Sequence, residues 1–261
     1  MLKQKIKKEW NEFGVLLKSV PTLVVVLFIL SVFSMNLLAN KSIYIPVNWL
    51  ALDCGIIVSW FAFFTMDILT KRFGPKASTE ITVLAIVINL FFCLLLFIGS
   101  VIHGTWGEAY DVDGSENTLI NGALNSTFGG TWYVVLGSTV AFLVSAIVNN
   151  LSNFAVGKLF KKNPDGLTAY VLRTYVSTAV GQFVDNLVFA LIVSHFFFGW
   201  TIVQCLTCAT TGMLVELLCE AIFFYPGFKI TSRWKKNNVG EEYLKLREGE
   251  TENESVCDGN E

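Results

Sequence analysis

Six long apolar segments dominate this chain of 261 residues. Each exceeds the roughly 17 residues that a helix needs to cross the hydrocarbon core of a bilayer. They are also too long and too continuous for the alternating ten-residue strands of an outer-membrane barrel. The sequence therefore predicts an all-α integral membrane protein with six transmembrane helices. The expected spans are residues 20–39, 47–70, 79–102, 131–157, 171–195 and 200–226.

Composition agrees with a membrane protein and limits the number of domains. Hydrophobic residues make up 53% of the chain and charged residues only 15%, a balance that excludes an ordinary soluble domain. Six spans with short connections account for the length and leave no room for a second catalytic domain. We expect residues 1–19 to form an amphipathic basic helix, 20–236 the six-span domain, and 237–261 a polar, largely acidic and disordered tail.

Basic residues predict the orientation of the spans. They precede the first span and follow the second, fourth and sixth, whereas the opposite connections hold almost none. Because lysine and arginine gather on the cytoplasmic side, both termini are expected in the cytosol. The polar stretch 103–130 then forms an external loop, and its part from Asn121 to Gly130 is expected to dip towards the bilayer as a lid.

The first helix has the pattern of an interfacial segment. Its apolar residues recur at helical spacing, and lysines occupy the other sides of the helix. A helix of this kind lies in the surface of an anionic membrane, so membrane lipid is an expected partner.

Motifs for enzyme chemistry are missing from the sequence. It has no phosphate-binding G-x-x-x-x-G-K-[ST] loop, no H-E-x-x-H and no G-x-S-x-G. Cys205 and Cys208 form a C-x-x-C inside an apolar helix without a second pair or nearby histidines, which argues against zinc. We therefore expect no enzymatic activity, no bound metal and no cofactor, and we expect the six cysteines to be reduced.

Polar residues inside the expected spans mark a candidate site. A charge at the bilayer centre costs on the order of 2.5–3.5 kcal/mol, so such residues usually face the interior and serve function. The fifth span is the richest, because its polar side chains share about half of the helix surface. They are Arg173, Ser177, Thr178, Gln182 and Asp185. Ser177 and Thr178 alone could bond back to backbone carbonyls, but that does not account for Gln182 and Asp185.

Other spans add polar residues to the candidate substrate-binding set. Those are Asn36 in the first span, Asp53 and Asp67 in the second, Asn150 and Asn153 in the fourth, and Glu216 in the sixth. Glu220 follows Glu216 by one turn, and two neighbouring carboxylates imply a bound cation, a proton or a basic partner unless Glu220 is solvated. Carboxylates, amides and hydroxyls beside aromatic rings suit a flat polar heterocycle such as a nucleobase or a vitamin.

The fifth-span run Arg173-x-x-x-Ser177-Thr178-x-x-x-Gln182-x-x-Asp185 closely resembles the signature of the queuosine precursor transporters, also called the vitamin uptake transporter family. Asp53-Cys-Gly55 and the run that begins at Asp67 are similar to that family's second span, and Pro226 stands where its sixth span closes. The resemblance implies a transporter in the bacterial cytoplasmic membrane that imports 7-deazaguanine bases for tRNA modification by alternating access. In that reading Asp185 binds the N–H edge of the base, and Gln182 and Asn150 bind its carbonyl and ring nitrogen.

Three positions in two spans depart from the family's pattern. Asn150 and Asn153 stand where members commonly have glutamine and aspartate, and Glu216 stands where many have lysine. The reversed charge favours, as a hypothesis, a ligand with a cationic amine, such as queuine or 7-aminomethyl-7-deazaguanine, over 7-cyano-7-deazaguanine.

Two other functions stay open from the sequence. The chain could be the substrate-binding subunit of an energy-coupling vitamin importer, which needs a partner ATPase, or a scaffold that transports nothing. A small-molecule substrate and membrane lipid are the expected partners, a homodimer stays open, and no nucleic acid is expected.

Overall fold

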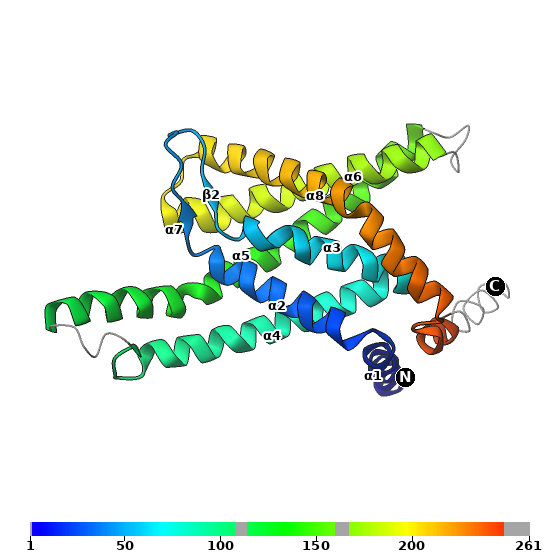
Figure 1. Cartoon of the computed structure of the whole chain (residues 1–261), viewed down its shortest axis with the longest axis horizontal. Helices are drawn as coiled ribbons and strands as arrows, with labels where there is room; N and C mark the ends of the chain where they lie inside the picture. The colour runs from blue at the N-terminus through cyan, green and yellow to red at the C-terminus, as the bar shows by residue number, and fades with distance from the viewer. Residues whose placement is uncertain (1, 108–113, 160–166, 248–261) are drawn as a thin grey trace. The chain divides into compact units, whose positions relative to one another are not determined.

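The computed structural model describes residues 2–107, 114–159 and 167–247, and the described chain is helical apart from one short hairpin (Figure 1). The elements in chain order are α1 (Leu2–Ser19), α2 (Thr22–Leu38), β1 (Ser42–Ile43), β2 (Leu52–Asp53), α3 (Ile56–Phe73), α4 (Pro75–Val101), α5 (Gly114–Leu159), α6 (Leu167–Phe189), the π-helical turn η2 (Ala190–Ser194), α7 (His195–Phe198) and α8 (Ile202–Lys236).

The chain divides into two compact units. Unit 1 comprises Met1–Ser31, Phe61–Ala85 and Ile222–Glu261, and unit 2 comprises Val32–Trp60 and Ile86–Ala221. The residues of α2, α3, α4 and α8 are divided between them.

Among the described residues, four helical segments are long and apolar enough to cross a membrane, which confirms an all-α fold with several membrane spans. They are Pro75–Val101, Leu119–Asn149, Thr178–Phe198 and Ile202–Lys236. A fifth span is added if the helices on either side of the 102° bend between Ser19 and Thr22 are counted together. The predicted number of six spans stays a prediction. The remaining expected segments are weaker, because α2 has only 17 residues and α3 carries Asp67, Lys71 and Arg72 in its last two turns.

In unit 2, α5 and α6 pack along one another (Figure 1). Two glycines allow α5 to approach α6 and the η2 turn that follows it. A Cβ at Gly137 would overlap Cγ2 of Val193, and a Cβ at Gly181 would lie 3.1 Å from Cβ of Asn149. Because neither glycine carries a side chain, the two backbones come closer than larger residues would permit.

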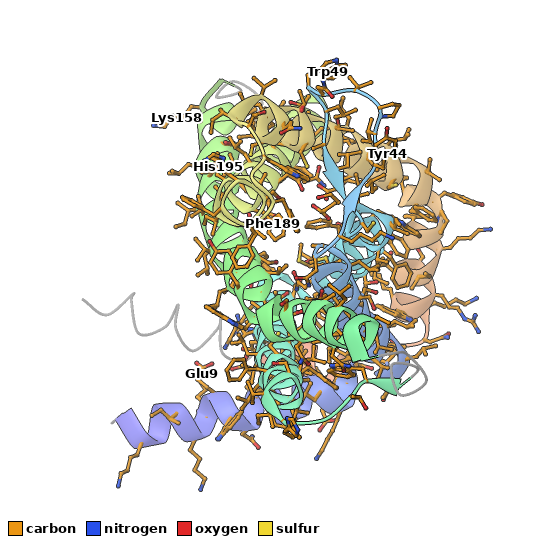
Figure 2. All side chains as sticks on the ribbon, turned by 90° about the vertical axis from the view of Figure 1, so that its left-hand side faces the viewer. Glu9, Tyr44, Trp49, Lys158, Phe189 and His195 are labelled. Carbon is orange, nitrogen blue, oxygen red and sulfur yellow. The ribbon has the colours of Figure 1, made fainter. Side chains whose placement is uncertain are left out.

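The β1–β2 hairpin lies next to the start of α8. Its strands pair antiparallel, Ser42 opposite Asp53, and the connection carries the exposed rings of Tyr44 and Trp49 (Figure 2). The hydroxyl of Thr207 on α8 donates to the backbone carbonyl of Trp49 at 2.7 Å. This contact and the apolar cluster around Ala51 fix the position of β2, and therefore the position of Asp53 at its end.

The expected loop over 103–130 is helical from Gly114 onward, because α5 already begins there. Its expected place outside the membrane and its role as a lid stay predictions. Trp106 explains why the segment is helical. Its backbone N–H donates to Oδ1 of Asn121 and its indole N–H donates to Oδ1 of Asn125, each at 2.7 Å, and its ring contacts Phe128. These three partners recur at helical spacing, so a helix presents them to Trp106 on one face. Residues 108–113 lie outside the described part.

In unit 1, α8 continues past Pro226 to Lys236, so the expectation that Pro226 closes the span is wrong. Proline removes one backbone hydrogen bond but does not have to end a helix when the following turns are packed. Here the next residue, Gly227, lies against α3, where its Cβ would come 3.2 Å from the ring of Phe64.

The tail expected from residue 237 begins with a helical segment over 241–247 in unit 1. Arg72 donates two hydrogen bonds to the carbonyl of Val239, at 2.6 and 2.9 Å, and Tyr243 is fully buried beside Phe73. Gly240 enters this helix with φ near 76°, a conformation that favours glycine. The tail's first residues are therefore held by packing that polar composition did not reveal.

Candidate functional site

The polar face of α6 lies against α5 in unit 2. Asp185 accepts a hydrogen bond at 3.0 Å from the hydroxyl of Ser145 on α5, and that hydroxyl also lies 2.9 Å from the backbone carbonyl of Phe142. A carboxylate that accepts a hydroxyl hydrogen bond keeps its orientation even where solvent is excluded. Asp185 is therefore positioned by its neighbouring helix.

Glu216 on α8 is buried, with only 4% of the residue exposed. The side-chain amide of Asn186 on α6 donates to Oε2 of Glu216 at 3.2 Å, and it also donates to the carbonyl of Gln182 at 3.0 Å. The hydroxyl of Ser59 provides a second hydrogen bond to the Glu216 carboxyl. Gly212 makes room for the amide, because a Cβ there would lie 2.9 Å from Nδ2 of Asn186.

Asp53 reaches the same region from β2, just before α3 begins. Its Oδ1 accepts the backbone N–H of Gly55 at 2.7 Å. Gly55 is tightly enclosed, since a Cβ there would come 2.8 Å from the carbonyl oxygen of Met35 on α2. Burial raises the pKa of Asp53 from 3.8 to about 6, although the hydrogen bond from Gly55 opposes the shift.

We call Asp53, Asp185 and Glu216 the acid cluster. The negative charges of Asp53 and Asp185 both act on Glu216. Their hydrogen-bond donors are neutral hydroxyls, an amide and a backbone N–H, and in the part of the chain that the structure describes no ion pair joins any of the three to a lysine or arginine. Buried carboxyls without a cation require protons or a positively charged ligand group.

Two further acceptors lie on the facing surfaces of α5 and α6. Oδ1 of Asn149 and Oε1 of Gln182 are buried, and neither has a hydrogen-bond partner among the described residues. An unsatisfied buried acceptor costs about 1–3 kcal/mol, so both atoms favour a ligand or water that donates hydrogen bonds. With the acid cluster, they place several hydrogen-bond acceptors on α5, α6 and α8 of unit 2. Within residues 2–107, 114–159 and 167–247, no group of three or more histidines, cysteines, aspartates or glutamates is arranged to hold a metal ion.

Gln182, Asp185, Glu216 and Asp53 all belong to unit 2, while Asp67 belongs to unit 1. The carboxylate of Asp67 lies 2.5 Å from Nζ of Lys71 one turn later, and 40% of its side chain is exposed. An exposed i, i+4 pair contributes only a few tenths of a kcal/mol. Asp67 is thus a neutralised side chain in its own unit.

The remaining predicted residues are placed less fully. Asn36 is buried on the part of α2 that belongs to unit 2, and Thr178 is half-buried on α6. The side chains of four others lie outside the described part of the structure, although their backbones are helical: Asn150, Asn153, Arg173 and Ser177.

Three donors at the acid cluster were not among the predicted site residues: Ser59, Ser145 and Asn186. Ser145 and Asn149 stand four residues apart in the polar fourth span, a spacing that could have identified that face. Asn186 directly follows Asp185 in the chain. Ser59 gave no signal, because a lone serine among apolar residues usually bonds to its own backbone.

Comparison with known proteins places the chain in a family. No curated protein and no solved structure matches it. The family model described as "Putative vitamin uptake transporter" matches residues 53–230, more than half of the chain, and the match includes all three members of the acid cluster. This protein therefore belongs to the vitamin uptake transporter family and is a multi-pass membrane transporter of a small molecule.

Proposed function

We propose that this protein imports a 7-deazaguanine queuosine precursor or salvage base and prefers a base that carries a cationic amine. Queuine and 7-aminomethyl-7-deazaguanine have such an amine, and 7-cyano-7-deazaguanine does not. The observation that carries the proposal is Glu216, which is buried within electrostatic reach of two other acids and has only neutral hydrogen-bond donors among the described residues.

Charge and hydrogen bonding both favour such a ligand. An uncompensated carboxylate within a membrane costs on the order of 2.5–3.5 kcal/mol, and a bound ammonium group would remove much of that cost. The base itself presents several N–H donors, and unit 2 offers the unpartnered oxygens of Asn149 and Gln182. An acceptor-rich site and a donor-rich ligand are chemically complementary.

Each residue then has a separate task in binding. Asp185, held by Ser145, accepts from the N–H edge of the base. Gln182 binds its polar ring atoms, and Glu216 pairs with the amine. The resemblance adds Asn150, Asp67 and Arg173 to the binding set, and these three stay predictions.

The proposed transporter has six spans, formed by α2, α3, α4, α5, α6 and α8, with both termini in the cytosol of a bacterial cell. It works by alternating access around the bound base, as secondary carriers do. Asp185 and Glu216 lie inside the candidate spans Thr178–Phe198 and Ile202–Lys236, which supports a site within the membrane rather than at its surface.

Binding of the three bases to the purified protein tests the charge preference. We expect wild type to bind the two amines more tightly than the nitrile. Glu216→Gln keeps the size of the side chain and should weaken amine binding by about ten- to a hundredfold, the range for a lost charged hydrogen bond, while leaving nitrile binding unchanged. The matched control is Glu220→Gln one turn later. Nitrile preference in wild type that persists in Glu216→Gln would contradict the proposal.

Uptake measurements test whether the protein works alone. In cells that lack every energy-coupling ATPase, we expect saturable accumulation of labelled 7-aminomethyl-7-deazaguanine when the protein is expressed. Binding without accumulation in these cells would instead favour a substrate-binding subunit that needs an ATPase.

A further inference from the structure

Helix α1 has one face that is buried within unit 1 and another that nothing in the described part of that unit covers. Glu12 and Leu16 are at most 1% exposed, whereas Ile6 is 54% and Trp10 is 70% exposed. The exposed apolar face points away from the packing that holds the helix.

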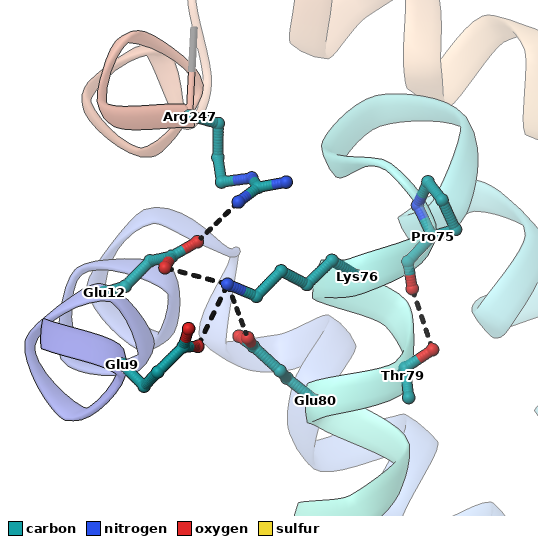
Figure 3. A network of polar contacts seen from close by, with 7 residues as sticks. All are labelled: Glu9, Glu12, Pro75, Lys76, Thr79, Glu80 and Arg247. Carbon is teal, nitrogen blue, oxygen red and sulfur yellow. Dashed lines mark hydrogen bonds and ion pairs between the residues drawn. The ribbon is translucent and has the colours of Figure 1, made fainter. Parts of the chain in front are cut away.

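A polar network fixes this orientation of α1 (Figure 3). Oε2 of Glu12 lies 2.8 Å from Nζ of Lys76, and Oε1 lies 3.3 Å from Nη1 of Arg247. Lys76 also pairs with Glu9 at 3.0 Å and with Glu80 at 3.8 Å. A buried carboxylate between two cations is costly to separate from them, so α1 cannot easily turn its buried face outward.

The outward face combines an apolar arc with a basic edge. At about 100° per residue, the arc spans roughly 60° of the helix. It comprises Ile6, Trp10, Phe13 and Leu17. Trp10 and Phe13 stack with ring centroids 5.9 Å apart. The exposed side chains of Lys3 and Lys7 follow directly along one side of the arc.

The bend between α1 and α2 determines the angle of α1 to the membrane plane. α1 and α2 meet at 102°, and most residues of α2 are apolar. When α2 follows the bilayer normal, α1 lies close to the plane of the leaflet. In that position an apolar arc enters the acyl chains, and lysines beside it meet the phosphate groups.

We propose that α1 is an anionic-phospholipid docking surface, in which Trp10 and Ile6 enter the leaflet and Lys3 and Lys7 select negatively charged headgroups. The network at Glu12 keeps this face outward. Through Arg247 it also joins α1 to the helical segment 241–247. The lipid would therefore bind to the part of unit 1 in which the first and the last described helical segments meet. This surface lies in unit 1 and uses none of the residues that we propose to bind the base.

Quenching of Trp10 by brominated lipids tests the proposal with the full chain. Brominated phosphatidylglycerol or brominated phosphatidylcholine is titrated into mixed micelles of the purified protein, and the signal of Trp10 is taken as the difference between wild type and Trp10→Phe. We expect quenching at a lower amount of phosphatidylglycerol than of phosphatidylcholine. Because one lysine near an anionic surface contributes about 1 kcal/mol, Lys3→Gln or Lys7→Gln should each raise the half-saturating amount about fivefold.

Lys245→Gln is the matched control, since it removes one exposed lysine of unit 1 that pairs with Glu241. It should leave the titration unchanged. Equal quenching by the two lipids, no quenching that depends on Trp10, or lysine variants that behave like Lys245→Gln would each overturn the proposal. A dimer that forms only when Trp10 is present would assign the face to a second copy of the chain and overturn it as well.

Discussion

Substitution of Gly212 by alanine separates the stability of α8 from the arrangement of the acid cluster. A Cβ at this position would lie 2.9 Å from Nδ2, 3.0 Å from Cγ and 3.2 Å from Oδ1 of Asn186. These atoms form the end of a flexible side chain, so Asn186 can turn away without moving α6. The amide would then lose its hydrogen bonds to Glu216 and to the carbonyl of Gln182.

The net effect on folding combines two opposing terms. Alanine stabilises a helix by about 0.5–1 kcal/mol relative to glycine. Loss of a hydrogen bond to a charged group costs about 1.5–3 kcal/mol. We therefore expect Gly212→Ala to lower the free energy of unfolding by about 1–2 kcal/mol, which corresponds to a fall in Tm of roughly 3–6 °C.

Gly122→Ala provides the matched control. Gly122 is also helical, is exposed on α5 and has no atom within 4 Å of the place that a Cβ would occupy, so only the helix term acts. Its Tm should rise by about 2 °C, from the same helix preference.

Thermal unfolding of the two purified variants compares the stabilities, and binding of 7-aminomethyl-7-deazaguanine compares the sites. Gly212→Ala should bind this base about tenfold more weakly, as expected for a misoriented charged partner. If Gly212→Ala were as stable as Gly122→Ala and bound the base normally, Asn186 would not position Glu216 and the reasoning would fail.

Three other substitutions test the geometry of the two units. Gly240→Ala places a side chain on a left-handed backbone, and its Cβ would overlap Cε1 of Phe73. In thermal unfolding it should destabilise the protein by about 2–5 kcal/mol. A Tm unchanged from wild type would contradict this contact. Ser145→Ala removes the donor to Asp185 and should cost about 1.5–3 kcal/mol, whereas Ser145→Thr keeps the hydroxyl and most of the stability. The folded protein binds a proton at Asp53 more tightly than the unfolded chain does, because burial raises the pKa of this carboxyl. The free energy of unfolding should therefore fall by about 3 kcal/mol as pH rises from 4 to above 6. Unfolding experiments at several pH values should show this fall in wild type and not in Asp53→Asn.

Helical spacing made the main features of the site predictable. Gln182 and Asp185 were assigned to one face of the fifth span and Glu216 to the interior of the sixth. The structure buries Glu216, leaves Gln182 and Asp185 half-buried, and assigns all three to unit 2. A period of 3.6 residues survives in any helix, so the sequence alone is enough to group such residues. The cost of an ionisable group within the membrane then directs attention to Asp185 and Glu216.

Long-range contacts could not be predicted in this way. The partners of Trp106 at Asn121 and Asn125 turn an apparently polar loop into the beginning of α5. Likewise, the position of Glu12 between Lys76 and Arg247 depends on residues far apart in the chain. Local composition records neither pairing, because each becomes favourable only after the helices have packed.

The π-helical turn η2 affects how insertions and deletions would change the span formed by α6, η2 and α7. The hydroxyl of Tyr133 donates to the carbonyl of Ile192 at 2.7 Å and so supports the widened turn. A π-helical turn accommodates one residue more than an α-helical turn, so the residues after Ser194 face about 100° away from where an unbroken α-helix would place them. Removing one residue from Ala190–Ser194 would restore the α-helical phase and turn His195–Phe198 to another side, while the polar face of α6 kept its direction. The span thus consists of two helical registers that can change their alignment by a single-residue step.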